Sequence, residues 1–152
     1  GMTVLGAAQP QTTPVHFLGH KEPTRKGRFV VLETDGNGSL SLSPLHMVVT
    51  FDGDLRRAID VRPGDSLRTV EGKQSAVRRV YTQEKIGLFQ PHTVHGTLYI
   101  DGFLVSCYAS LSKVTDPTLE ARFLHAILLP LRAVYKFAGI NLLGSFFYKH
   151  RP

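Results

Sequence analysis

The sequence predicts a mainly β fold followed by a short helical appendage. Between Val15 and Ser110, short apolar or alternating segments are separated by Gly, Pro and Asp, a pattern typical of many short strands joined by turns. From Asp116 onward, apolar residues recur instead at helical spacing. This change of period divides the chain into a β domain, residues 1–113, and a helical tail, residues 114–152.

The expected strands can be placed in order from their composition. Residues 28–34 are apolar and β-branched and run into Asp35-Gly36-Asn37-Gly38, a strong turn signal. Residues 39–43 alternate Ser and Leu, the period of a half-buried strand. Further strands are expected over residues 46–51, 67–70, 77–82, 96–100 and 103–109.

A helix is expected to begin at Asp116-Pro117, because Asp is a favoured N-cap and Pro is tolerated at the first helical position. Pro130 lies within the helical segment and should kink or split it. Gly139 is expected to end it. The apolar stripe of this segment consists of Leu119, Phe123, Ile127 and Leu131.

An internal repeat with an offset of sixty-two positions indicates a duplicated β unit. Leu5 matches Leu67, Val15 matches Val77 and Glu22 matches Glu84. The later copy is preceded by a Pro-Gly-Asp turn at residues 63–65. In the first copy, which starts at Thr3, the corresponding Pro-Gly-Asp turn should lie before Thr3. We therefore expect the beginning of that copy to be missing.

Composition restricts the classes of function. The chain has 152 residues, enough for one domain, and a net charge of +6. Its basic residues are dispersed, unlike the dense stripe of a nucleic-acid-binding protein, so no nucleic-acid partner is expected. A single cysteine, Cys107, excludes an internal disulfide and a zinc site of several thiolates. No apolar run is long enough to span a bilayer.

Two segments resemble the hedgehog-type Hint domain. The first runs from Thr34 to Val48 and includes Ser43-Pro44-Leu45-His46, similar to the family block in which a strand ends in Thr-x-x-His. The second, residues 96–109, ends in Ser-Cys-Tyr-Ala and resembles the close of the family's β domain. The tail beginning at Gly139-Ile140-Asn141 is similar to the region that engages sterol or another lipid. The resemblance implies a pseudo-twofold β disk.

The resemblance also implies a reaction. In such domains a cysteine at the start of the domain attacks the preceding carbonyl and forms a thioester, which a sterol then displaces, so that the upstream fragment leaves with a lipid ester. This is autocatalytic proteolysis coupled to lipid transfer. Nothing before Thr3 supplies the cysteine, so we expect this chain alone, without the nucleophile strand, to be inactive.

His46 is the principal catalytic candidate, because an imidazole that titrates near neutrality can deliver a proton to the departing amide nitrogen. The alternative is an ordinary histidine at a strand end. Ser43 stands where the family has threonine and keeps the hydroxyl that orients the scissile amide or the imidazole. The alternative for Ser43 is a plain alternating strand residue.

His20 falls where the resemblance places the aspartate that activates the sterol hydroxyl. A histidine could act there as a base toward an alcohol or toward water, or it could be an exposed loop residue. Cys107 lies in an apolar strand, and buried thiols in apolar surroundings are usually inert. We interpret it as a structural or redox-partner residue near the active site rather than a nucleophile. His92 and His95 are not expected to bind metal.

The tail stripe either packs on its own domain or contacts lipid. Basic residues at Arg122, Arg132 and Lys136 and the later apolar run support the second interpretation, and both interpretations stay open. The predicted lipid-contacting residues are Phe123, Ile127, Leu131, Phe146, Phe147 and Tyr148.

The expected partners are an upstream fragment in cis and a sterol, another lipid or a membrane surface. No cofactor or metal is expected, and the lipid is a second substrate. The resemblance implies the secretory pathway, in the endoplasmic reticulum lumen, or the extracellular space. Two other hypotheses are a non-catalytic lipid-binding or protein-interaction module that keeps the Hint fold, and an unrelated basic β domain.

Overall fold

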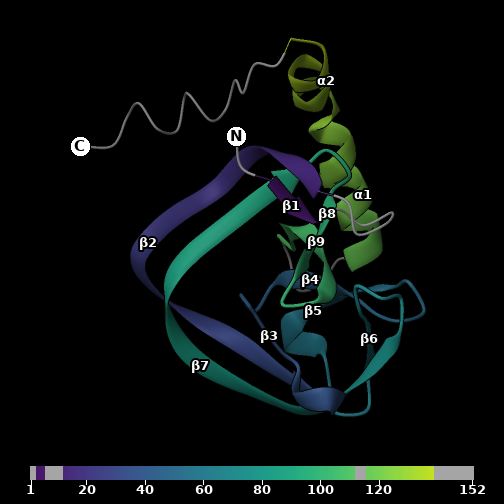
Figure 1. Cartoon of the computed structure of the whole chain (residues 1–152). Helices are drawn as coiled ribbons and strands as arrows, with labels where there is room; N and C mark the ends of the chain where they lie inside the picture. The colour runs from purple at the N-terminus through teal and green to yellow at the C-terminus, as the bar shows by residue number, and fades with distance from the viewer. Residues whose placement is uncertain (1–2, 6–11, 112–115, 139–152) are drawn as a thin grey trace.

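The computed structural model describes residues 3–5, 12–111 and 116–138, and the fold is mainly β with two helices at the end of the described chain. Figure 1 shows two long strands forming a curved ribbon on one side of the molecule and the helices standing on the other. The predicted fold class is confirmed. No helix within the described ranges is long and apolar enough to cross a bilayer.

The first sheet has the order β1-β2-β7-β6, with β3 paired to β2. Its strands are β1 (Thr3–Leu5), β2 (Thr12–Thr34), β3 (Ser39–Leu42), β6 (Ser66–Arg68) and β7 (Gln74–Thr93). Exchanging β1 with β6 and β2 with β7 gives the same strand order read from the other end. β2 begins at Thr12 and β7 at Gln74, which are sixty-two positions apart as in the sequence repeat. The pairing therefore has the pseudo-twofold arrangement expected of a duplicated unit.

The second sheet has the order β5-β4-β9-β8. Its strands are β4 (His46–Val49), β5 (Leu55–Arg57), β8 (Thr97–Ile100) and β9 (Phe103–Ala109). β9 is buried over most of its length because both of its faces are covered. The core between the sheets includes Leu32, Leu40, Val48, Leu67, Val105 and Cys107.

Two features of the strands differ from the sequence prediction. β2 and β7 are 23 and 20 residues long, whereas only short strands were expected in these regions. They pair with each other through several register shifts, and such bulges bend the strands without ending them. Pro23 and Gly27 lie inside the long strand β2 and do not end it. The short strand β5 was not predicted.

The helical segment follows the prediction closely. The Asp116 side chain accepts a hydrogen bond from the Leu119 amide at 2.9 Å, so it caps α1 (Pro117–Ile127). The chain splits near Pro130 into a second helix, α2 (Leu129–Ala138). α1 packs on the second sheet through Ala121, Leu124 and Leu128, which meet Met47, Tyr108 and Leu55. Short 3₁₀ turns occupy Asp35–Asn37 and Ala58–Asp60.

Candidate functional site

His46 is positioned by a tight turn that joins β3 to β4. The His46 amide donates to the Ser43 carbonyl at 3.0 Å, which closes the turn Ser43-Pro44-Leu45-His46. Ser43 and His46 are therefore the first and last residues of a turn closed by an i to i+3 hydrogen bond. Both side chains line one cavity, so the structure brings these two predicted residues together.

The His46 ring is buried, with 8% of the residue exposed. Its Nε2 lies 2.8 Å from the Ser106 carbonyl oxygen, which can only accept, so Nε2 carries the hydrogen and donates. This bond lies in a bulge, where three residues of β9 stand opposite the single residue Met47 of β4. In the neutral ring, Nδ1 then holds the lone pair that can take up a proton.

Burial lowers the pKa of His46, because the charged imidazolium loses its hydration, and the hydrogen bond to the Ser106 carbonyl opposes part of that shift. The ring is consequently neutral at pH 7. A neutral imidazole with a fixed tautomer can accept a proton at Nδ1 and return it to a nearby atom.

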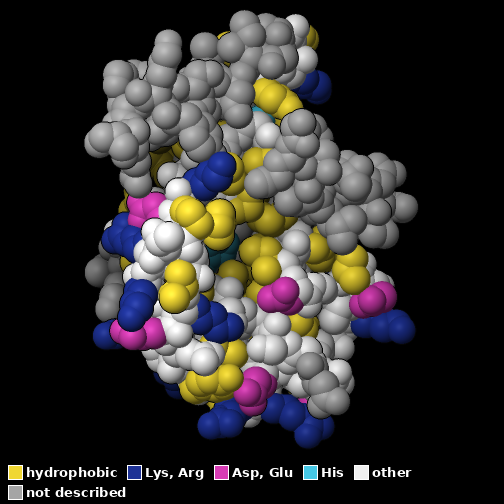
Figure 2. Space-filling view, turned by 60° about the vertical axis from the view of Figure 1, so that its left-hand side comes forward, with side chains coloured by type: hydrophobic (Ala, Val, Ile, Leu, Met, Phe, Trp, Pro, Cys, Tyr) yellow, Lys and Arg dark blue, Asp and Glu magenta, His cyan; other side chains and the backbone are white. Residues whose placement is uncertain are grey.

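The cavity beside His46 has a volume of about 180 Å³ and lies between the two sheets. Its polar lining comes from Ser41, Ser43 and Gln90. Ser41 Oγ accepts a hydrogen bond from Lys85 Nζ at 2.6 Å, and Gln90 Nε2 donates to the Cys107 carbonyl at 3.3 Å. The other lining residues are Phe29, Leu42, Leu88, Phe89, Ile100 and Ala109. Figure 2 shows one face of the molecule, where hydrophobic side chains gather around a hollow with a histidine side chain visible inside it.

Cys107 lies beside this cavity, but its thiol belongs to the core. Its Sγ is fully buried and lies 3.4 Å from both the amide nitrogen and Oγ1 of Thr93. Burial raises the pKa of the Cys107 thiol, and the Thr93 contacts only partly oppose this. The carbonyl of Cys107 and that of the preceding residue, Ser106, are both bonded to residues that line the cavity. This geometry supports a structural role close to the candidate site.

His20 lies in β2, within the irregular pairing between Leu18 and Lys21, and its side chain falls outside the described residues. The preceding residue does have a described environment. A Cβ at Gly19 would lie 3.0 Å from Gln90 Oε1. Since Gln90 lines the His46 cavity, the β2 backbone beside His20 passes close to that cavity.

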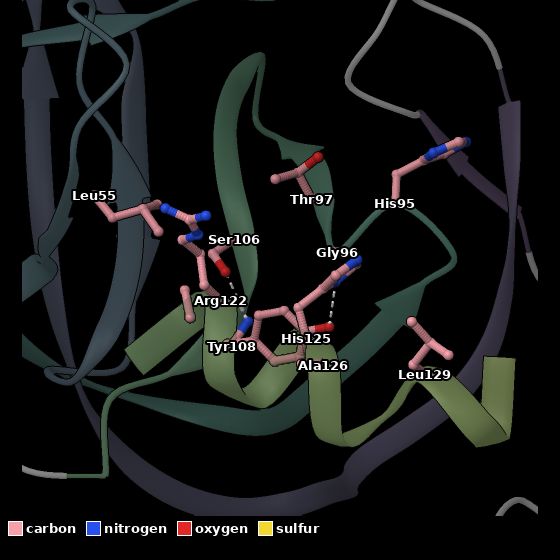
Figure 3. Close-up of a pocket in the computed structure, with 11 residues that line it drawn as sticks. Leu55, His95, Gly96, Thr97, Ser106, Tyr108, Arg122, His125, Ala126 and Leu129 are labelled. Carbon is pink, nitrogen blue, oxygen red and sulfur yellow. Dashed lines mark hydrogen bonds between the residues drawn. The ribbon is translucent and has the colours of Figure 1, made fainter. Parts of the chain in front are cut away.

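A second, larger cavity of about 350 Å³ lies between β9, the turn before β8 and the helices (Figure 3). Ser106 and Tyr108 of β9 both line this cavity and form one wall. The remaining lining residues are Leu55, His95, Gly96, Thr97, Ala121, Arg122, His125, Ala126 and Leu129. Sequence reasoning missed this cavity, because its walls come from four separate segments and its helical wall carries small residues.

Three side chains fasten the helices to β9 at the edge of this cavity. The Tyr108 hydroxyl lies 2.9 Å from His125 Nδ1, and Arg132 Nη1 donates to the same hydroxyl at 3.2 Å. Arg132 also bonds the Nδ1 atom and the carbonyl oxygen of His125. Burial raises the pKa of Tyr108 to about 12. Burial, followed by the charge of Arg132, lowers the pKa of His125.

The predicted lipid-contacting residues divide into three groups. Phe123 and Ile127 are exposed on α1, so the predicted stripe does not pack on the β domain. Leu131 is partly buried. Phe146, Phe147 and Tyr148 lie outside the described residues. The parts of the chain described here contain no group of three or more His, Cys, Asp or Glu residues that could hold a metal ion.

A family model described as the Hint module matches residues 2–143. The chain belongs to this family. Within it the Hint domain is of hedgehog type. The Tiggy-winkle hedgehog protein of Danio rerio is 33% identical over 111 residues, which are 65% of this chain and 26% of that protein. The Indian hedgehog protein of Xenopus laevis is 34% identical over 131 residues, which are 78% of this chain and 30% of that protein.

This Hint domain thus spans roughly a quarter to a third of the length of those two relatives. Solved structures support the fold alone. The crystal structure of the gp41-1 intein superposes with a TM-score of 0.55 at 13% identity, over 62% of this chain and 73% of the intein. The solution structure of the Pab PolII intein has the same TM-score and identity, over 64% and 68%. The resemblance found in the sequence is confirmed.

Proposed function

We propose that this Hint domain serves hedgehog-type self-processing, in which a peptide bond upstream is converted to a thioester and a lipid then displaces the thiol. The proposal depends mainly on the buried His46. The Ser106 carbonyl sets the tautomer of its ring, and Ser43 lines the same cavity. The family membership supports the reaction class. Both substrates, the upstream peptide and the lipid, are part of the proposal.

In the first step, the sulfur of a cysteine at the start of the domain bonds to the carbonyl carbon before it, and the C–N bond breaks. His46 Nδ1 takes the thiol proton and delivers it to the departing nitrogen, so the amine leaves neutral. The low pKa of His46 suits this shuttle because the ring begins neutral. The Ser43 hydroxyl is available to hydrogen-bond the scissile amide.

In the second step, a lipid hydroxyl attacks the thioester carbon, the C–S bond breaks and the thiolate leaves. The hydroxyl proton goes to a base, for which His20 is our candidate. The larger cavity supports delivery of an apolar alcohol, because Ser106 lines that cavity and its carbonyl also holds the His46 ring. We place the reaction in the secretory pathway, with release of an upstream signalling fragment.

The test joins this domain to an upstream segment that ends in the nucleophilic cysteine. A soluble thiol should release the upstream fragment, and mass spectrometry should find a lipid ester on its carboxy terminus when sterol is supplied. If His20 is the base, transfer should decline as the pH falls through roughly 6.5, whereas a carboxylate base would act down to about 4. A free carboxylate as the only product in the presence of sterol would reject lipid transfer.

A non-catalytic lipid-binding module is the second candidate function, because the larger cavity and the exposed helices do not depend on thioester chemistry. The thiol experiment separates the two functions. Fragment release by thiol supports processing. Sterol binding by a precursor that no thiol can cleave would support the binding module.

A further inference from the structure

One pair of polar side chains at the His46 cavity has no part in the proton transfers proposed above. Ser41 lies on β3, two residues before Ser43, and lines the cavity. Lys85 lies on β7, and its Nζ is 2.6 Å from Ser41 Oγ. Both side chains are partly buried. The pair therefore joins a hydroxyl of the cavity wall to a positive charge behind it.

The direction of this hydrogen bond leaves the Ser41 hydroxyl as a donor. An ammonium group can only donate, so Ser41 Oγ accepts from Lys85. No acceptor for the hydroxyl hydrogen of Ser41 appears among the described residues. A hydroxyl that accepts from a cation becomes a stronger donor in turn, because hydrogen bonds in a chain polarise one another. Ser41 can therefore donate to a group inside the cavity.

The charge of Lys85 is not neutralised within the described chain. None of the ion pairs between described residues includes Lys85. The 12 Asp and Glu residues of the sequence all fall within the described ranges. A positive charge beside a confined cavity stabilises negative charge that develops there, and more strongly than in water because the surroundings are less polar. The pair is therefore suited to a group that becomes an anion during a reaction.

The other polar side chains of the cavity are engaged or already have a role. Gln90 and His46 each donate through a ring or amide nitrogen to a backbone carbonyl of β9. The Ser43 hydroxyl is the candidate partner of the scissile amide. Ser41 is thus the cavity donor with a positive charge behind it.

We propose that the Ser41 hydroxyl, held by Lys85, donates to the oxygen of the reacting carbonyl and stabilises the tetrahedral oxyanion. When the cysteine sulfur bonds to the carbonyl carbon, the π electrons of the C=O bond move to that oxygen. Ser41 keeps its proton and only hydrogen-bonds the anion, while His46 carries the thiol proton to the departing nitrogen. The C=O bond re-forms as the C–N bond breaks. This inference rests on the proposed function and adds a catalytic residue, Ser41, and a positioning residue, Lys85.

The test uses the precursor that contains the upstream cysteine, with thiol-dependent release as the measurement. Ser41→Ala should slow release by about 10²- to 10³-fold, the usual loss for one oxyanion donor. Ser41→Thr restores a hydroxyl and should recover most of the rate. Ser39→Ala is the matched control and should release at the wild-type rate, because Ser39 is an exposed serine of β3 that does not line the cavity.

Lys85 acts through Ser41, so the effect of its variants should follow the charge. Lys85→Met should slow release by roughly tenfold, because a charge-assisted hydrogen bond is about twice as strong as a neutral one. Lys85→Arg keeps the charge and should recover most of that loss. In a precursor that already carries Ser41→Ala, Lys85→Met should have little further effect, because the hydroxyl through which it acts is gone.

Release at the wild-type rate in Ser41→Ala, or an equal loss in Ser39→Ala, would overturn the role of Ser41. An effect of Lys85→Met that is undiminished in the Ser41→Ala precursor would overturn the positioning role of Lys85. A wild-type precursor that no thiol cleaves would instead reject self-processing itself. A failure of the oxyanion assignment is therefore distinguishable from a failure of the proposed function.

Discussion

The cavity at His46 and the cavity beneath α1 differ in size, polarity and wall construction. The cavity at His46 is about 180 Å³ and combines a buried imidazole with two serines and a glutamine. The cavity beneath α1 is about 350 Å³ and has aliphatic side chains from α1, α2 and β5. The Ser106 carbonyl serves the first cavity, and its side chain lines the second. One residue of a buried strand thus separates a site suited to proton transfer from a site suited to an apolar molecule.

A small β domain can combine two tasks when each task has its own cavity. Proton transfer needs a group of fixed tautomer in a confined space, which the interior of two sheets can provide. A lipid needs an apolar surface that remains accessible, which a helix laid over a sheet edge can provide. The comparison yields four predictions, ordered by the size of the expected effect.

The largest effect is expected at His46. In a precursor that contains the upstream cysteine, His46→Ala should slow thiol-dependent release by about 10²- to 10⁴-fold, the usual contribution of general acid–base catalysis. Gel analysis of the released fragment measures the rate. His95→Ala, which changes a histidine of the other cavity, is the control and should leave thiol-dependent release intact. Equal losses in both variants would erase the functional distinction between the cavities.

A steric effect on stability is expected at Gly96, which has φ +76° and lies against the helical cluster. A Cβ there would lie 2.6 Å from His125 Nδ1. Gly96→Ala should lower the free energy of unfolding by about 1 kcal/mol for the backbone and by a further 1–3 kcal/mol for the clash. Gly102→Ala is matched, because its φ is +84° with nothing within 4 Å. Urea denaturation that gives equal losses would contradict the close packing of His125.

The hydroxyl of Tyr108 should contribute about 1–3 kcal/mol to the free energy of unfolding, because it bonds both His125 and the buried guanidinium of Arg132. Tyr108→Phe should show this loss in urea denaturation. Tyr99→Phe, on the neighbouring strand β8, provides the comparison for removal of a hydroxyl. If the two variants lose the same stability, the cluster does not fasten the helices.

The smallest effect is a dependence of stability on pH. Burial lowers the pKa of both His46 and His125 in the folded chain, whereas the unfolded chain keeps values near 6.5. The unfolded state therefore binds more protons as the pH drops below about 6.5, and the free energy of unfolding falls. His125→Asn should flatten this decline, since Asn retains a neutral acceptor. Thermal unfolding measured between pH 7 and pH 5 checks the slope, and an unchanged slope would contradict the proposed titration.

The fold class, the helix start at Asp116 and the break near Pro130 could be predicted from the sequence. The last two features depend on local chemistry, because a capping carboxylate and a missing amide donor are properties of neighbouring residues. The sixty-two-residue repeat also predicted the pseudo-twofold pairing, because duplicated segments fold alike. The order of strands within each sheet required the structure.

The surroundings of each candidate residue depend on contacts between segments far apart in the chain. The bond from His46 to the Ser106 carbonyl joins residues sixty positions apart across a bulge, and no local pattern specifies a bulge. The helical stripe was legible in the sequence, but which side of α1 packs depended on small residues such as Ala121 meeting β4 and β9. Helical periodicity identifies a face, whereas burial depends on the shape of the surface that meets it.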